Sequence, residues 1–366
     1  MVGRHSRDAR SRTRPLRQGT PHAQRLRWLV LFLSVVLVAG CGAPTAPALA
    51  PEAPSELALD DPSEAATETP SEPAAEPSTE EAPHASHALA ARAAFGAFTY
   101  GGVWQGMEPV ARLELELGRR LDVVHWFMDW DHAYDPAMVE GVLAGGASPL
   151  ISWQPMRQDL SDIADGRHDA YLRGWAQGVR RAPGTVFLRP FPEMNGEWVP
   201  WNGDPEALRQ AWTRLVRLFD EEGADNVRWV WSPNVTDEPR SDENRMERYY
   251  PGDEHVDVLA LSGYNWGETR PTIGWQSFEE IFAGGYERVT AIGPQPVWLA
   301  EFASSDVGGD KAAWVRDMLA STAFPRIEAL VWFDEDKEAD WRMTSHPDVL
   351  RAFQEGLGVA PVSASR

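Results

Sequence analysis

The chain has 366 residues, enough for one large domain or two medium ones with a substantial buried core. Its 34 Lys and Arg are outnumbered by 55 Asp and Glu, and the formal charge of −21 argues against a nucleic-acid partner. A single Cys excludes an intramolecular disulfide and a zinc site built from several cysteines.

The N-terminal 41 residues have the pattern of an export signal. Residues 1 to 27 contain eight Arg and one acid, and the apolar run WLVLFLSVVLVAG follows. Thirteen residues are too few to span a hydrocarbon core about 30 Å thick, so the run indicates a signal rather than a membrane helix. It ends at Cys41, and this ending resembles the bacterial lipoprotein signal, which implies an exported protein lipid-anchored at the cell surface or in the periplasm. The alternative is an ordinary secretory signal with a chance cysteine.

Residues 42 to 92 are predicted to form a disordered linker. The stretch 42 to 91 contains nine Pro, ten acids and no aromatic residue, so it has too little apolar surface to offset the entropy of ordering. Residues 1 to 41 carry a charge of +7 and residues 42 to 92 carry −9. Of the total of −21, the predicted domain at 93 to 366 therefore carries −19.

From residue 93 onward, eight runs rich in β-branched and aromatic residues alternate with stretches of helical period. The predicted strands are 94 to 100, 121 to 127, 148 to 154, 185 to 191, 227 to 232, 256 to 264, 296 to 302 and 327 to 333. Among the helices, 205 to 221 shows one apolar stripe after Asp204 as a cap and Pro205 in the first turn. Strict alternation implies parallel strands with right-handed crossovers.

Eight such units in one domain favour an α/β fold of the (β/α)8 TIM-barrel type. An open doubly wound sheet would usually have fewer strands and a glycine-rich phosphate turn after the first, which GAFTYGG does not provide. Active sites of barrels lie where the strands end. Residues at the C-terminal ends of the predicted strands are therefore the candidates for function.

Two glutamates stand at such ends. Glu193 follows the fourth strand in RPFPEMNGEWVPW, and Glu301 follows apolar residues of the seventh in VWLAEF. The surroundings of Glu193 are partly apolar, which should raise its pKa and suit it to a general acid. Alternation along the strands places Glu193 with Arg189, and Glu301 with Leu299, so both carboxyl groups are expected in the barrel mouth.

The segment RPFPEMNGEWVPW at 189 to 201 resembles the acid/base motif of glycoside hydrolase family 26. The resemblance continues in order through GYNW at 263 to 266, AEF at 300 to 302 and VWFDEDKEADWRM at 331 to 343. It implies a retaining endo-β-glycanase in which Glu193 is the acid/base, Glu301 the nucleophile and Tyr264 the tyrosine that hydrogen-bonds the nucleophile. Retention would require the two carboxyl groups to lie about 5 to 5.5 Å apart.

The chain departs from the family pattern at Pro192, where the family usually has His. Proline offers no side-chain donor, so the contacts of that His must be replaced or lost. His125 or Gln154 could substitute for it, or the change could alter substrate choice or lower activity.

The 17 Trp suggest sugar binding, because indole rings stack on the apolar C–H faces of sugars. The predicted substrate-binding residues lie at or near strand ends: Trp104, Trp126, Trp153, Arg189, Asn195, Trp198, Trp201, Trp266 and Trp332. Trp231 is a further cleft candidate, whereas Trp175, Trp212 and Trp314 fall within helices and are expected in the core.

No cofactor or catalytic metal is expected, because the nine His show no metal-ligand spacing. The resemblance implies a polysaccharide substrate and favours mannan endo-1,4-β-mannosidase activity. The alternatives are a β-1,3-1,4-glucanase acting on mixed-linkage β-glucan, and a noncatalytic surface glycan-binding protein. We expect a monomer that contacts the membrane only through its lipid anchor.

Overall fold

The computed structural model describes residues 88–359. The predicted export signal, its Cys41 and the predicted linker up to residue 87 lie outside the described residues. None of the helices within 88–359 has the length and apolar character needed to cross a membrane.

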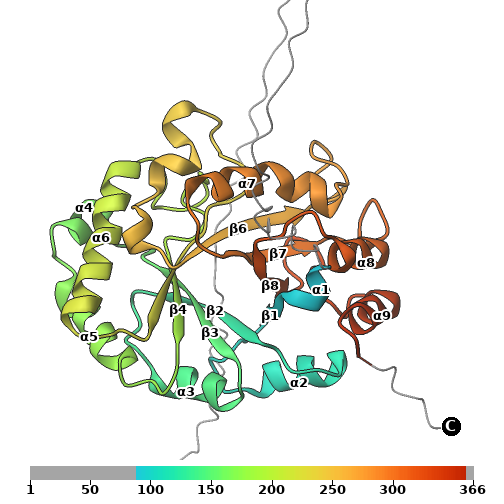
Figure 1. The fold of residues 1–366 in the computed structure, drawn as a ribbon, viewed down its shortest axis with the longest axis horizontal. Coiled ribbons are helices and arrows are strands. Elements are labelled where there is room, and N and C mark those ends of the chain that lie inside the picture. The colour runs from blue at the N-terminus through green and yellow to red at the C-terminus, as the bar shows by residue number, and fades with distance from the viewer. Residues whose placement is uncertain (1–87, 360–366) are drawn as a thin grey trace, which may run out of the picture. The chain divides into compact units, whose positions relative to one another are not determined.

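Eight parallel strands pair in chain order, and the first pairs with the last, so the sheet closes into a barrel (Figure 1). The strands are β1 (Ala94–Thr99), β2 (Val123–Asp129), β3 (Ser148–Gln154), β4 (Val186–Pro190), β5 (Val227–Trp231), β6 (Val258–Asn265), β7 (Val297–Ser304) and β8 (Ile327–Asp334). All eight predicted strands are confirmed, and with them the (β/α)8 fold.

Helices surround the strands (Figure 1). They are α1 (Leu89–Arg92), α2 (Glu108–Leu117), α3 (Pro136–Ala144), α4 (Leu160–Ala164), α5 (Asp169–Val179), α6 (Pro205–Glu221), α7 (Phe278–Ile292), α8 (Lys311–Ala320) and α9 (Pro347–Gly356), with short 3-10 turns at η1 (Asp242–Asn244), η2 (Met246–Tyr249) and η3 (Asp253–His255). Helix α6 has the predicted bounds, because the Asp204 side chain accepts from the Ala207 N–H and Pro205 pre-sets the first turn.

Two apolar layers line the two faces of the barrel wall. A small cluster that includes Val123, Leu150, Val258 and Trp298 fills the interior. A much larger cluster lies between the strands and the helices, and it takes up the alternate residues of the same strands. The layer to which a strand residue belongs therefore decides whether its side chain can reach the barrel mouth.

The fold begins a few residues before position 93. Leu89, in α1, is fully buried, and the Arg92 guanidinium donates to the carbonyl oxygens of Phe324 and Ile327. The composition of 42 to 92 conceals this short helix, because four residues are too few to show a period. These four residues belong to the barrel and not to the linker.

Candidate active site

Glu193 lies in the loop after β4 with an unusual backbone. Its φ is 56°, and Phe191 has a φ of 51°; these are the only non-glycine residues with positive φ in the part of the chain that the structure describes. Positive φ costs roughly 1–2 kcal/mol for a residue with a Cβ. The loop is held in place because the Glu193 N–H donates to the Ser232 carbonyl oxygen at 2.8 Å, at the end of β5.

Each carboxyl oxygen of Glu193 accepts a hydrogen bond. Asn234 Nδ2 donates to Oε1 at 2.8 Å, and Trp198 Nε1 donates to Oε2 at 2.8 Å. Burial raises the pKa of Glu193, and the negative charge of Glu301 raises it further; the Arg189 charge and the two hydrogen bonds oppose this rise. The direction of this shift is the one expected of a general acid.

Glu301 faces the barrel interior because the pairing of β7 with β6 shifts by one residue. Leu261 pairs with Leu299, but Ser262 pairs with Glu301, so Ala300 is an extra residue. Leu299 lies in the helix-facing layer, and strict alternation would have placed Glu301 there too. The predicted grouping of Glu301 with Leu299 is therefore wrong, and the bulge is what turns the carboxyl group to the mouth.

Both oxygens of Glu301 are also hydrogen-bonded. The Tyr264 hydroxyl donates to Oε1 at 2.6 Å, and Arg189 Nη1 donates to Oε2 at 2.6 Å. Burial and the Glu301 charge raise the pKa of Tyr264 well above its ordinary value, so its phenol remains a hydrogen-bond donor. The contact of Tyr264 with Glu301 is the one that the family resemblance implied.

Arg189 acts from behind Glu301 and does not reach the substrate side. Its side chain is 0% exposed, and it also donates to the hydroxyl oxygens of Ser152 and Ser262. The Ser152 hydroxyl in turn contacts His125 Nε2 at 2.7 Å. The prediction that Arg189 binds substrate is wrong, because the guanidinium is fully buried and donates to side chains of strands β3, β6 and β7.

Asn195 is likewise buried and structural. Its Nδ2 donates to Asp237 Oδ1 at 2.9 Å, and its Oδ1 accepts from the Asn234 N–H at 2.7 Å. These bonds fasten the loop after β4 to the loop after β5 and so place Asn234 beside Glu193. The prediction that Asn195 contacts substrate is wrong, because its polar atoms are used by the neighbouring loop.

Four tryptophans predicted to bind substrate lie in the core instead: Trp126, Trp153, Trp201 and Trp332 are at most 2% exposed. Trp126, Trp153 and Trp332 occupy the helix-facing positions of their strands. Trp201 Nε1 donates to the Pro192 carbonyl oxygen at 2.9 Å and supports the loop that carries Glu193. Trp231 is also buried, and the three helical tryptophans, Trp175, Trp212 and Trp314, lie in the core as predicted.

Of the tryptophans predicted to bind substrate, Trp104, Trp198 and Trp266 are partly exposed. Trp198 contacts Glu193, and the guanidinium carbon of Arg270 lies 3.5 Å from the centre of the Trp266 ring. Trp341 packs against Trp266 and Tyr264, with ring centres 5.0 and 5.1 Å away. Trp198 therefore contacts the acid/base candidate itself, and Trp266 lies beside the tyrosine that binds Glu301.

Sequence reasoning missed two features of the mouth. Asn234 has no motif that marks it, since its role depends on contacts between two loops. The phenyl rings of Phe98, Phe127 and Phe333 meet near His125, with Phe98 stacked on Phe333 at 4.8 Å. These rings could have been found by alternation, because Phe98 and Phe333 follow the interior positions Ala94 and Val331.

Across the described residues 88–359, His, Cys, Asp and Glu form no group of three or more that could hold a metal ion. The neighbouring acids Glu221 and Glu222, at the end of α6, both form ion pairs with Arg173.

The barrel carries one carboxyl group after β4 and a second, bound by an arginine and a tyrosine, on β7. Two carboxyl groups are also what glycoside hydrolases use in catalysis. Residues 156–307, which include Glu193, Tyr264 and Glu301, match the model of Glycosyl hydrolase family 26. Over these residues the barrel of this chain is therefore similar to that family.

Curated relatives are similar to this chain in sequence. Endoglucanase H of Acetivibrio thermocellus is 35% identical over 273 residues, which is 70% of this chain and 30% of that protein. A mannan endo-1,4-beta-mannosidase of Bacillus subtilis is 31% identical over 214 residues, 55% of this chain and 48% of that protein. The chain thus spans less than half the length of either relative.

Solved structures share the fold. A modular endo-beta-1,4-mannanase from Cellulomonas fimi has a TM-score of 0.57 at 18% identity, with 74% of this chain and 71% of that chain covered.

Proposed function

We propose that the barrel hydrolyses internal linkages of a β-1,4-mannan backbone by double displacement with retention, and that no cofactor takes part. The observation that carries the proposal is the hydrogen bonding of two carboxyl groups that follow or lie on barrel strands: Glu193 accepts from Asn234 and Trp198, and Glu301 accepts from Arg189 and Tyr264. An acid and a nucleophile with separate hydrogen-bond partners are what this reaction requires.

In the first step, Glu193 gives its proton to the glycosidic oxygen while a Glu301 oxygen attacks the anomeric carbon. The bond to the leaving sugar breaks, and a glycosyl ester on Glu301 forms. Arg189 and Tyr264 hold the attacking carboxylate in one orientation at 2.6 Å each. Because both are donors, they also stabilise the carboxylate when it departs in the second step.

In the second step, Glu193 takes a proton from water, the water oxygen attacks the anomeric carbon, and Glu301 is released. The ester carries no charge, so one of the causes that raise the pKa of Glu193 is absent at this stage. The hydrogen bonds from Asn234 and Trp198 then favour the ionised form. Glu193 therefore changes from acid to base as the reaction requires.

Release of reducing sugar from mannan, with the anomer of the first product identified by NMR, tests this proposal. Glu193→Ala and Glu301→Ala should each lower turnover by at least about 10³-fold. The parent should yield the β-anomer first. An inverted product, or turnover that survives either substitution, would contradict the assignment, and binding without release would favour a noncatalytic glycan-binding protein.

A second candidate substrate is a mixed-linkage β-glucan. The match to Endoglucanase H extends over 70% of this chain, against 55% for the mannosidase of Bacillus subtilis, and Pro192 lies beside the acid/base. Hydrolysis rates measured at equal concentrations of mannan, glucomannan and barley β-glucan distinguish the two candidate substrates. A higher kcat/KM on barley β-glucan than on mannan would make the glucan the preferred substrate.

We further propose that the chain is exported as a monomer and anchored by a lipid on Cys41. The support is the basic and apolar pattern that precedes the only cysteine. Incorporation of labelled palmitate into the parent and not into Cys41→Ala, in a bacterial host, tests the anchor. Label in both variants would refute it.

A further inference from the structure

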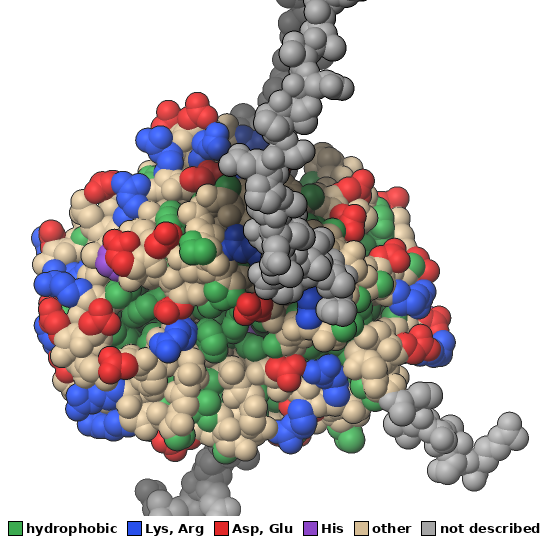
Figure 2. Space-filling view, in the orientation of Figure 1, with side chains coloured by type: hydrophobic (Ala, Val, Ile, Leu, Met, Phe, Trp, Pro, Cys, Tyr) green, Lys and Arg blue, Asp and Glu red, His purple; other side chains and the backbone are tan. Residues whose placement is uncertain are grey.

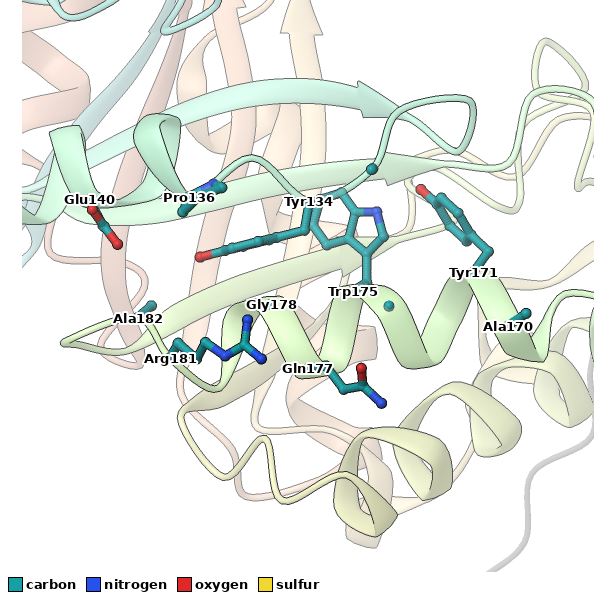
Figure 3. Close-up of a pocket in the computed structure, with 12 residues that line it drawn as sticks. Tyr134, Pro136, Glu140, Ala170, Tyr171, Trp175, Gln177, Gly178, Arg181 and Ala182 are labelled. Atoms are coloured by element: carbon teal, nitrogen blue, oxygen red, sulfur yellow. The ribbon is translucent and has the colours of Figure 1, made fainter.

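On the face of the molecule drawn in Figure 2, acidic and basic side chains are intermixed, and neither sign forms a continuous patch. A cavity of about 620 Å³ lies on the outer wall, between α3 and α5, and its lining includes Tyr134 and Trp175 (Figure 3). Trp175 belongs to the core, and the Tyr134 ring packs directly on α5, where a Cβ on Gly178 would lie 2.4 Å from it. The buried charged side chains are more informative, because burial of a charge costs free energy unless other groups compensate it.

Lys311, the first residue of α8, is one of two Lys or Arg side chains that are buried in the part of the chain that the structure describes. The other is Arg189, which holds Glu301. Burial lowers the pKa of Lys311, and the charge of Asp306 opposes this fall. The oxygens around the Lys311 ammonium therefore have to compensate its burial.

These oxygens belong to two loops at the mouth end of the barrel. Lys311 Nζ donates to the carbonyl oxygens of Asp340 at 2.8 Å and Arg342 at 2.9 Å, and to the Ser345 hydroxyl oxygen at 3.2 Å. All three acceptors lie in the loop between β8 and α9. Asp306, in the loop after β7, forms an ion pair with Nζ at 3.2 Å. The ammonium thus uses its three N–H groups and ties the loop after β8 to the start of α8.

The two carbonyl groups that Lys311 binds flank Trp341. The Trp341 N–H donates to the Glu335 carbonyl oxygen at 2.9 Å, and the Trp341 carbonyl oxygen accepts from Trp332 Nε1 at 2.7 Å. Although Trp341 lies in a loop, it is 1% exposed. Hydrogen bonds to the backbone therefore hold Trp341 in place, and Lys311 makes those on either side of it.

Trp341 packs against the tyrosine that binds Glu301. The ring centres of Trp341 and Tyr264 are 5.1 Å apart, and the Tyr264 hydroxyl donates to Glu301 Oε1 at 2.6 Å. Trp266 and Phe333 also pack on Tyr264, with ring centres 5.8 and 6.0 Å away. Trp341 is the nearest of these three rings, so a shift of the loop after β8 would remove the closest support of Tyr264.

We propose that Lys311 is a positioning residue for the nucleophile. By holding the loop after β8, it keeps Trp341 against Tyr264, and this support keeps the Tyr264 hydroxyl in contact with the carboxylate. The role of Glu301 as nucleophile rests on the proposed function. Without the ammonium, two carbonyl oxygens of the loop each lose a part-buried hydrogen bond, and the loop shifts until water replaces the donor.

The first measurement needs no substrate. The full-length chain is isotope-labelled at Cζ of its seven tyrosines, and the NMR signal of Tyr264 is identified by its loss in Tyr264→Phe. Lys311→Met removes the ammonium and keeps a side chain of similar length. The Tyr264 signal should move in this variant, because a weaker hydrogen bond changes the shielding of Cζ. Lys311→Gln keeps one amide donor and should move the signal less, and it replaces Lys311→Met if that variant does not fold.

Arg326→Met is the matched control. Arg326 also donates to backbone carbonyl oxygens, those of Thr290, Gly293 and Gln295, at the end of α7 and before β7. It lies just before β8, at the opposite end of the barrel from the mouth. This variant therefore loosens a tied segment far from the carboxyl groups, and the Tyr264 signal should stay in place. Thermal midpoints show how much stability each variant loses.

The second measurement is a double-variant cycle on the polymer that the parent hydrolyses. Tyr264→Phe removes a hydrogen bond to a charged group and should lower kcat about 10- to 100-fold. Lys311→Met weakens the same bond and should lower kcat at least about 3-fold. Because Lys311 acts through Tyr264, the double variant should turn over at the rate of Tyr264→Phe alone, whereas independent effects would multiply. Arg326→Met should keep the parental kcat.

A Tyr264 signal that stays in place in both Lys311 variants would overturn the proposal, and so would an equal movement in Arg326→Met. Losses of kcat that multiply in the double variant would also overturn it, because Lys311 would then act on another group. A parent that releases sugar from neither mannan nor barley β-glucan would refute the proposed function alone. The Tyr264 signal would still decide whether Lys311 positions the tyrosine.

Discussion

At the scale of single residues, the acid/base is surrounded by donors. Trp198 Nε1 and Asn234 Nδ2 each face one carboxyl oxygen of Glu193, and neither nitrogen accepts a hydrogen bond. The Asn234 side-chain amide cannot exchange its oxygen and nitrogen positions without losing a hydrogen bond, because its Oδ1 accepts from the Thr236 N–H at 3.0 Å. A proton on Glu193 therefore has no acceptor in these partners and is left for the glycosidic oxygen. Asn234 is a side-chain donor to Glu193, which Pro192 cannot be.

Asn234→Ala should lower kcat by about 10- to 100-fold, the equivalent of one hydrogen bond to a charged group. The bond favours the ionised carboxylate, so its loss raises the pKa of Glu193. Activity depends on the protonated form, and the alkaline limb of the kcat/KM profile should move to higher pH. Rates across the pH range check this, and a lowered rate with an unmoved limb would mean that Asn234 only supports the loop.

Glu301→Gln should lower the pKa of Glu193. The substitution removes a negative charge that raises this pKa, while the Arg189 charge that lowers it remains. Titration of isotope-labelled glutamate by NMR, in the parent and in the variant, measures the change. An unchanged or higher pKa would show that the two carboxyl groups do not interact.

At the scale of elements, the eight strands and α6 could be predicted because each shows its own period or cap. Which face a residue occupies was harder to predict. Once Val123, Leu150 and Val331 are known to face the barrel interior, alternation places three tryptophans on the helix-facing side: Trp126, Trp153 and Trp332. The sequence alone does not say which of the two apolar faces of a strand is the interior one. The bulge at Ala300 has no sequence signal, because it appears only in the pairing of β6 with β7.

Whether a tryptophan packs against the helices or lies beside Glu193 should decide which property its substitution changes. Trp332 packs on Phe353 in the helix-facing layer, so Trp332→Phe should lower the free energy of unfolding by about 1–3 kcal/mol and leave KM unchanged. Trp198→Phe removes a donor to Glu193 and should lower kcat with a small change in stability. Urea denaturation and steady-state rates of both variants check this. A raised KM for Trp332→Phe with no loss of stability would mean that Trp332 contacts substrate.

At the scale of the whole molecule, the barrel is closed at its start by α1. Deletion of residues 1–87 should leave a folded and active barrel, because the described contacts begin with Leu89. Deletion of residues 1–92 also removes the buried Leu89 side chain and the hydrogen bonds of Arg92 to Phe324, before β8, and to Ile327, the first residue of β8.

The second deletion should therefore cost about 2–5 kcal/mol of unfolding free energy, the usual cost of removing a buried leucine. Arg92 adds to this, because the carbonyl oxygens of Phe324 and Ile327 each lose a part-buried hydrogen bond. Chemical denaturation of the two truncated chains measures the difference. Equal midpoints would show that α1 is dispensable and that the barrel starts at β1.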